Sequence, residues 1–351
     1  MTTLITSPPT ASPALQELPS SPSRRWLPWA MRVAALGVVT ASVAIDRTVL
    51  VVLPLLFILV VPFEKMFPRH RGQSLRRPHA LLDVRYALAT GLFGIVSLVF
   101  AIVIGIASLA WLPGLAIRPL VGMIPAIALP FVGIALFDLS IYWAHRWSHE
   151  VPALWRFHAV HHSTEQLDWV SGFRGHPFDG AVVAPAAVLL LAAGFDPTFT
   201  GVLAAVQIIT GLFLHANVRW RWRPLHSVVI TPEFHHWHHA NEAEAINSNY
   251  SVFLPLWDIV FGTYYMPGNK RPLRYGVSEP IPTTMVGQLR YPFEGVRSPR
   301  TMLRHPWWAV CAGVRALRTV VRDMWRSTFR PRTHRPRPGE PCRWAATPPQ
   351  R

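Results

Sequence analysis

The stretch YALATGLFGIVSLVFAIVIGIASLAWL, residues 86–112, contains no charged side chain in 27 positions. A helix needs roughly 20 apolar residues to cross the hydrocarbon core of a bilayer, because it rises about 1.5 Å per residue. This stretch is therefore long enough to cross a membrane with some tilt. It predicts a protein whose helices cross a lipid bilayer.

Five more apolar blocks flank this stretch. Residues 26–45 and 48–63 are separated by the polar pair Asp46 and Arg47, and residues 120–144 form a further long block. Residues 181–195 and 198–214 are shorter and are interrupted by Asp196 and Pro197, which favours a helical hairpin that is short for a full crossing. We therefore predict an all-α, multi-pass membrane protein with about four full transmembrane helices and one shorter hairpin.

The composition excludes several classes of protein. Only 15% of the residues are charged and 51% are hydrophobic, whereas a soluble domain carries about 25% charged residues. The formal net charge is +16, but the basic residues lie outside the apolar blocks, which favours an anionic lipid surface over nucleic acid as partner. With two cysteines, Cys311 and Cys342, neither a disulfide framework nor a thiolate metal site is expected.

The charges of the connecting segments predict an orientation. Segment 64–85 is rich in Lys and Arg, and such loops remain in the cytoplasm. Alternation of the spans then places both termini and every histidine cluster on the cytoplasmic side. An Arg-rich, Lys-poor composition is typical of a GC-rich bacterial genome, so the expected location is the bacterial inner membrane.

Three parts are expected along the chain. Residues 1–25 are rich in Pro, Ser and Thr, which is typical of a disordered tail. Residues 26–280 form the membrane domain, and residues 281–351 form a basic C-terminal tail. Within this tail, residues 307–329 place apolar side chains at helical spacing beside four arginines. This pattern predicts an amphipathic helix on the inner leaflet, with packing against the membrane domain as the alternative.

Three histidine motifs carry the chemistry. Spacings of three and four residues place side chains on one helical face, and neutral imidazoles are common ligands of Fe, Zn and Cu. Eight imidazoles exceed the four to six positions of a single ion, so the count predicts two metal ions close together. The motif histidines are His145 and His149; His158, His161 and His162; and His235, His238 and His239.

Four further residues are candidates for the site. His215 follows the second half of the predicted hairpin and His176 precedes the first half, and either side chain could complete a coordination sphere. Asp138 and Tyr142 lie two turns and one turn before His145. We expect them to orient the ligands, because ligating imidazoles usually donate their second N–H to an outer partner.

A zinc protease site is disfavoured. Its HExxH motif requires a glutamate directly after the first histidine, and Arg146, Ala159 and His236 occupy that place in the three motifs. His236 is rotated by about 100° from His235 on a helix. It is therefore expected outside the ligand set, in solvent or behind the ligands.

With these motifs in order, the sequence resembles the fatty acid hydroxylase/sterol desaturase superfamily of integral-membrane di-iron oxidoreductases. The resemblance covers about residues 61–265 and includes Asn249-Tyr250 and Trp257-Asp258. It implies a non-haem di-iron centre held by the eight histidines, often with extra ligands at the positions of His176 and His215. One departure is Ser251, where many members have glycine.

The resemblance also implies a function. Such an enzyme uses O2 to hydroxylate or desaturate a C–H bond of a lipid, such as a sterol, a fatty acyl chain or an alkyl-lipid. The sequence shows no haem or flavin motif, so electrons are expected from a separate donor of ferredoxin or cytochrome b5 type with its reductase. Two alternatives stay open: a non-catalytic membrane protein with structural zinc, and a metal transporter, although a transporter favours polar ligands inside the spans.

Overall fold

The computed structural model describes residues 27–219, 223–268, 270–296, 303–304 and 306–329. These residues form helices and loops, with two isolated β-bridges and no strand among them. The predicted all-α class is therefore confirmed. The tail expected to be disordered, residues 1–25, lies outside the described residues, as do residues 330–351 at the end of the basic tail.

The helices are joined by both short and longer connections. Their bounds are α1 Leu27–Ile45, α2 Val49–Met66, α3 Ala80–Leu88, α4 Thr90–Ala107, α5 Trp111–Val121, α6 Leu129–Glu150, α7 Pro152–His162, α8 Ala184–Ala193, α9 Pro197–Leu214, α10 Pro232–His238, α11 Leu256–Val260, α12 Met285–Arg290 and α14 Pro306–Phe329. Short connections join α1 to α2, α3 to α4, α4 to α5, α6 to α7 and α8 to α9, whereas longer segments precede α3, α8, α10, α11 and α12. Short 3-10 turns occur at η2 Trp169–Phe173, η3 Asp179–Val183, η4 Arg223–Leu225 and η5 Tyr291–Phe293.

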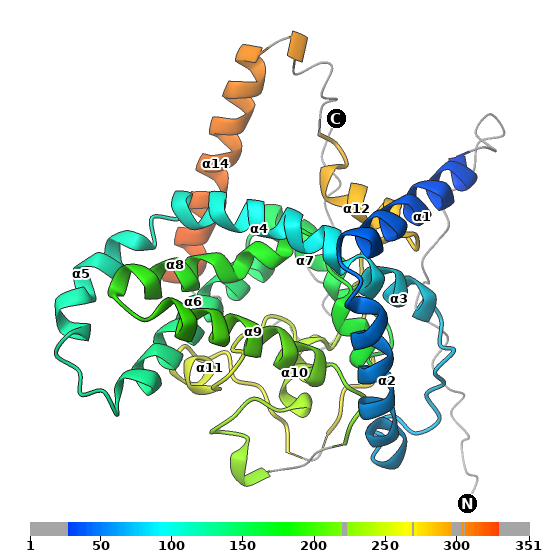
Figure 1. Ribbon diagram of the computed structural model, residues 1–351, viewed down its shortest axis with the longest axis horizontal. Coiled ribbons are helices and arrows are strands. Elements are labelled where there is room, and N and C mark those ends of the chain that lie inside the picture. Colours follow the sequence, from blue (N-terminus) through cyan, green and yellow to red (C-terminus); the bar gives the residue numbers. More distant parts are fainter. Residues whose placement is uncertain (1–26, 220–222, 269, 297–302, 305, 330–351) are drawn as a thin grey trace, which may run out of the picture.

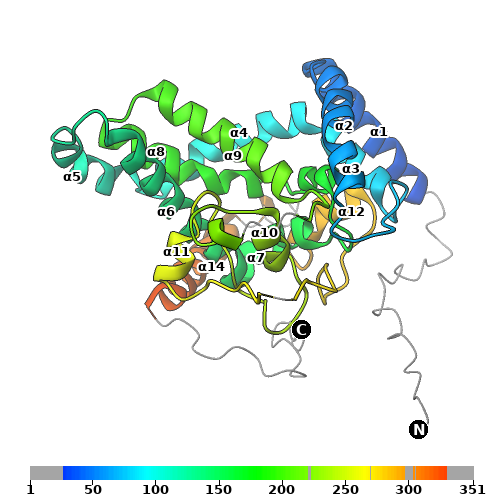
Figure 2. The ribbon, with the colours of Figure 1, turned by 90° about the horizontal axis from the view of Figure 1, so that it is seen from below.

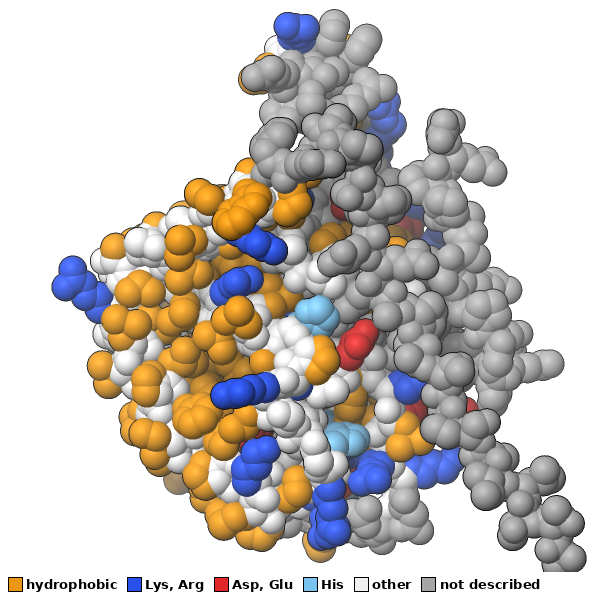
Figure 3. Space-filling model, turned by 90° about the vertical axis from the view of Figure 1, so that its right-hand side faces the viewer, with side chains coloured by type: hydrophobic (Ala, Val, Ile, Leu, Met, Phe, Trp, Pro, Cys, Tyr) orange, Lys and Arg blue, Asp and Glu red, His pale blue; other side chains and the backbone are white. Residues whose placement is uncertain are grey.

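Four of the described helices, α1, α2, α4 and α9, are long and apolar enough to cross a membrane. Most of their side chains are exposed, and apolar side chains cover a broad area of the face shown in Figure 3. Exposed apolar surface of this extent requires a partner that is itself apolar. The protein is an integral membrane protein, as the composition predicts.

The spans differ from the expectation in two respects. Of the predicted block 86–112, only residues 90–107 form the span α4, because residues 86–88 end α3 and residues 111–112 begin α5.

Residues 120–144 also do not form one apolar helix, because α5 ends at Val121 and α6 begins only at Leu129. The intervening turn contains Gly122 and Pro125, residues that interrupt helices, and α6 buries the polar residues Asp138 and Arg146. Helix α6 is therefore not among the four candidate spans. Helix α9, which was expected to be half of a short hairpin, is the fourth span instead.

The helices form a layer that supports the histidine-bearing ends. Figures 1 and 2 show α4, α8 and α9 next to one another, with α7, α10 and α11 together on one side of this layer. The apolar core between α6, α8 and α9 includes Phe137, Leu190 and Leu203. At Gly133 of α6 a Cβ atom would lie 2.5 Å from the Phe199 ring, so only glycine permits this close approach.

The turn between α1 and α2 packs beside the beginning of α4. The Leu92 backbone N–H donates to Ser42 Oγ at 3.0 Å, and Gly91 approaches Ser42 and Asp46 so closely that a Cβ would lie 2.8 Å from the Ser42 carbonyl oxygen. Strict alternation of spans would place these two segments at opposite membrane surfaces. The cytoplasmic orientation inferred from loop charge therefore stays a prediction.

Cysteine labelling in intact cells tests this orientation. With Cys311 and Cys342 replaced by serine, we expect Met123→Cys to react with a membrane-impermeant thiol reagent added outside. Met123 is 80% exposed in the turn between α5 and α6. Ser74→Cys, at an exposed position in the basic loop, should react only after permeabilisation. Reaction of Ser74→Cys in intact cells would reverse the predicted orientation.

Candidate metal centre

Four helix ends bring the histidines together. The C-terminal part of α6 carries His145 and His149, and α7 carries the second motif. Val151 between these helices is extended, with φ −102° and ψ 114°, as expected for a residue that precedes proline. This single residue turns α7 back toward α6. His215 directly follows α9, and Thr231 caps the N-terminus of α10, which carries the third motif.

The histidines form two groups, each with ligand atoms within 4.8 Å of one another. The five-histidine group contains His145, His149, His158, His162 and His238. The four-histidine group contains His161, His215, His235 and His239. All eight motif histidines and His215 are therefore brought together, in a number that suits two metal ions.

Members of one motif separate between the two groups. On α7, His158 and His162 belong to the five-histidine group, whereas His161 belongs to the other. The groups adjoin each other, since the rings of His162 and His239 stack with centroids 4.1 Å apart. The spacing predicts one face for each motif, but the packing of four helices determines which side chains share a group.

Backbone carbonyls fix the protonation of several imidazoles. His145 Nδ1 lies 2.7 Å from Tyr250 O, and His161 Nδ1 lies 2.8 Å from Arg174 O. His215 Nδ1 contacts Gly211 O at 2.6 Å. A carbonyl oxygen only accepts hydrogen bonds, so each Nδ1 carries the proton and donates it. The neutral ring then presents a bare lone pair at Nε2, which is the form that binds a metal.

These lone pairs face one another. His161 Nε2 and His215 Nε2 are 3.2 Å apart, although the protons of both rings are held at Nδ1. His149 Nε2 and His238 Nε2 are buried without a hydrogen-bond partner among the described residues. Opposed lone pairs repel and buried polar atoms without partners cost free energy. A cation between the nitrogens removes both costs, so the residues fit bound metal ions.

Burial also keeps the rings neutral. It lowers the pKa of His161 to about 4, with a further decrease from the neighbouring His158. It lowers the pKa values of His162, His238 and His239 well below 6.5, again with contributions from nearby histidines. Desolvation disfavours the charged form of a buried imidazole. At neutral pH these side chains are therefore available as ligands.

One carboxylate in contact with the site was missed in the sequence. Asp179, at the start of η3, accepts from His158 Nδ1 at 2.9 Å, and its backbone N–H donates to His176 O at 2.8 Å. This contact is the carboxylate–imidazole pairing that orients a metal ligand. Its position three residues after His176 was the available signal in the sequence, but nothing in that spacing relates it to His158.

Asp138 and Tyr142 hold a loop instead of an imidazole. Asp138 accepts from the backbone N–H groups of residues 252–254 at 3.0–3.1 Å. The Tyr142 hydroxyl pairs with Thr263 Oγ1 at 3.0 Å and accepts from Arg146 Nη1. Among the described residues neither side chain hydrogen-bonds a histidine. The expected direct contact with the ligands is therefore not formed.

The loop that these residues hold does contact the ligands. Tyr250 O accepts from His145 Nδ1, and Ser248 O accepts from His238 Nδ1 at 3.0 Å. Asp258 fixes the loop by accepting from the N–H groups of Tyr250 and Ser251, each at 2.8 Å. This explains why the Asn-Tyr and Trp-Asp motifs accompany the histidines. The Ser251 backbone N–H makes its contact whichever side chain is present.

Two buried histidines lie outside both groups. His176 Nδ1 accepts from the Phe178 N–H, and its Nε2 donates to Leu289 O, so both ring nitrogens are engaged. His236 is fully buried, with Nε2 3.0 Å from Ala216 O and Nδ1 2.9 Å from the Tyr275 hydroxyl. The structure does not bring His176 to the site. The interior position of His236 corrects the expectation that it could face solvent.

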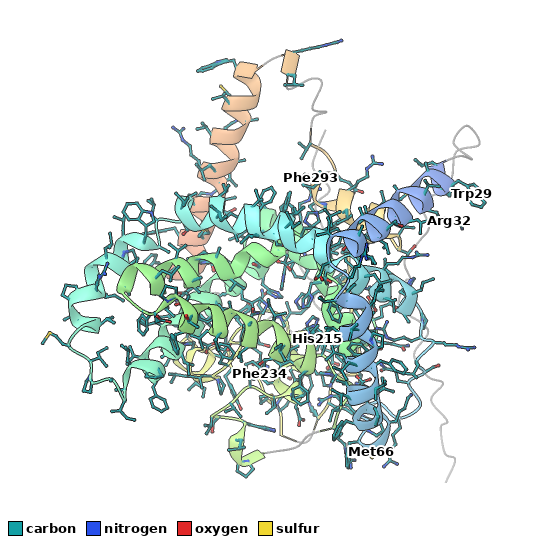
Figure 4. The ribbon with its side chains drawn as sticks, in the orientation of Figure 1. Trp29, Arg32, Met66, His215, Phe234 and Phe293 are labelled. Carbon is teal, nitrogen blue, oxygen red and sulfur yellow. The ribbon has the colours of Figure 1, made fainter. Side chains whose placement is uncertain are left out.

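A cavity of about 560 Å³ leads to both groups. Its inner wall includes His149, His162 and His238 of one group and His239 of the other. The rest of its lining mixes apolar side chains such as Trp155 and Ile246 with polar ones such as Asn241. Figure 4 shows His215 at the end of α9, where its side chain is buried. The cavity offers a route by which a small or extended molecule reaches the ligand atoms.

The fold and the site define a helical membrane protein with two adjoining groups of histidines that could hold metal ions. Residues 130–263 match the model of the fatty acid hydroxylase family, which confirms the resemblance over this part of the chain. The chain is 34% identical over 164 residues to an ornithine lipid hydroxylase of Rhizobium tropici. It is 29% identical over 166 residues to the alkylglycerol monooxygenase of Danio rerio.

These similarities cover part of each protein. The matches include 46% of this chain in both cases, but 49% of the Rhizobium protein and 35% of the Danio protein. A very-long-chain aldehyde decarbonylase of Oryza sativa is 28% identical over 36% of this chain and 21% of its own length. The chain thus spans about half or less of the relatives it matches. No solved structure matches it.

Replacing Asp179 tests its contact with the candidate ligand His158. We expect Asp179→Asn to lower metal affinity about 10–100-fold, as for other outer partners of ligating imidazoles. Asp196→Asn is the matched control, because Asp196 is exposed and caps α9, a role that asparagine also fills. Metal titration of the two purified variants measures the difference. Equal affinities would show that the Asp179 contact does not support the centre.

Proposed function

We propose that the protein is an oxygen-dependent membrane oxidoreductase that holds two iron ions and oxidises a C–H bond of a lipid. The observation that carries this proposal is the set of nine imidazoles in two adjoining groups, six of them buried and three half-buried. Several have bare Nε2 atoms that face one another. An all-nitrogen set without thiolate suits a redox metal such as iron. Relatives named as lipid hydroxylase and alkylglycerol monooxygenase support a lipid substrate.

The residues of the chain would hold the metal ions in place and enclose the reacting part of the lipid. Bound iron would supply the activation of O2, which is chemistry that no side chain provides. The carbonyls of Tyr250, Ser248 and Arg174 hold the imidazoles in the tautomer that binds metal. The cavity beside His149 and His238 would admit the reactive part of the lipid. Its mixed lining, with Trp155 and Ile246 beside Asn241, suits a molecule that has both apolar and polar parts.

The proposal extends to the electron donor, the membrane and the division of the chain. Electrons would come from a separate donor of ferredoxin or cytochrome b5 type. The membrane would be the bacterial inner membrane, with the site and both termini in the cytoplasm, supported by the basic loop 64–85. Residues 26–280 would form the membrane domain and residues 281–351 a basic tail.

Metal analysis combined with comparative lipidomics tests the function. We expect two iron ions per purified chain, one for each group. Cells that express the gene should contain an oxidised lipid that is absent without the gene and absent under anaerobic growth. Zinc in place of iron would indicate a structural metal site. Bound iron with no oxygen-dependent change in any lipid would favour a metal-binding or transport protein.

A further inference from the structure

Helix α14 presents an apolar stripe that the described residues leave uncovered. Figure 1 shows α14 extending away from the other helices. Its apolar side chains recur every three or four residues, and their exposed fractions range from 45% at Val314 to 72% at Trp307. The residues of the stripe are Trp307, Val310, Val314, Leu317, Val321 and Trp325. A stripe of this kind on a water-exposed helix needs an apolar partner.

Four exposed arginines follow the stripe along one flank. Arg315, Arg318, Arg322 and Arg326 each come one position after a residue of the stripe, which is a rotation of about 100° on a helix. The side opposite the stripe carries small and polar residues such as Ala312 and Ala316.

The last turn of α14 is held by the protein. Ser327 Oγ donates to Glu150 Oε2 at 2.7 Å, and Trp147 Nε1 donates to Thr328 Oγ1 at 3.1 Å. Trp147 and Glu150 belong to the end of α6 that also carries His149. The helix is thus fastened at one end beside the candidate metal centre, while the stripe continues along the rest of its length.

We propose that α14 lies in the headgroup layer of an anionic membrane, with its stripe in the acyl boundary and its arginines at lipid phosphates. A helix with a strong apolar face, low overall hydrophobicity and a basic flank is the type that binds in this plane. Arginine side chains bury their stems along apolar surface and extend their charges to the headgroups. A second copy of the chain fits less well, because pairing two stripes would bring eight arginines together.

Fluorescent labels on two adjacent positions test the proposal. Cys311 and Cys342 are replaced by serine, and an environment-sensitive fluorophore is attached to Leu317→Cys, in the stripe, or to Ala316→Cys, on the opposite side. The full chain is placed in nanodiscs of phosphatidylcholine with phosphatidylglycerol. We expect the label at 317 to shift to the blue and to be quenched by brominated acyl chains, and the label at 316 to do neither.

Reversal of charge tests the anionic partner. With the label at 317, Arg318→Glu combined with Arg322→Glu should abolish the blue shift and leave bound metal unchanged. Discs of phosphatidylcholine alone should give a smaller shift than discs with phosphatidylglycerol. Equal quenching at 316 and 317 would overturn the proposal. So would a blue shift at 317 that is independent of lipid and accompanied by two copies of the chain in one particle.

Discussion

His215→Ala is expected to lower the bound metal from two ions to one per chain and to abolish turnover, while His176→Ala leaves both ions bound. His215 Nε2 lies 3.1–3.2 Å from the Nε2 atoms of the other three histidines of its group. Its loss leaves three ligands where four are present. His176 is similarly buried, at 5% exposure against 3%, but both of its ring nitrogens are already hydrogen-bonded.

Elemental analysis of the two purified variants decides between these outcomes. Circular dichroism should show the same helical content in both, so that loss of metal is not loss of fold. Oxidation of lipid under O2 gives the second measurement. Two ions retained in His215→Ala would remove this residue from the ligand set. Equal loss in His176→Ala would show that burial of a histidine, and not its place in a group, determines metal content.

The sequence predicted which histidines lie at the site, but not which of the two groups each one joins. Spacing of three and four residues indicates a shared helical face, and every histidine chosen on this basis lies in one of the two groups. The division of α7 between His158 and His161 depends on the positions of α6, α9 and α10. Contacts between distant helices leave no periodic signal in the sequence.

The residues that orient the ligands were the least predictable. Most of them act through backbone carbonyls, as at Tyr250 and Gly211, and any residue type supplies a carbonyl. Asp138 illustrates the opposite error, since a carboxylate near a ligand in sequence serves a loop in space. The block 120–144 was predicted without regard to Gly122 and Pro125, the helix-breaking residues that separate α5 from α6.

Asp83→Ala is expected to reduce the free energy of unfolding by about 3–5 kcal/mol, because it leaves two buried guanidinium groups without this partner. Asp83 is fully buried. Its carboxylate accepts from Arg174 Nε at 2.5 Å and from Arg77 Nη2 at 2.6 Å. Arg77 keeps two bonds to Asp168, whereas Arg174 keeps only a long contact of 3.3 Å with Ser163 Oγ among the described residues.

The same substitution at Asp323 provides the control. Asp323 pairs with Arg322 and Arg326, whose side chains are more than half exposed, and an ion pair of that kind contributes at most about 1 kcal/mol. Denaturant titration in mixed micelles measures both variants against the parent chain. Because Arg174 O accepts from His161 Nδ1, Asp83→Ala should also weaken metal binding in the four-histidine group. A loss of stability no larger than that of Asp323→Ala would mean that water or another group replaces the carboxylate between Arg77 and Arg174.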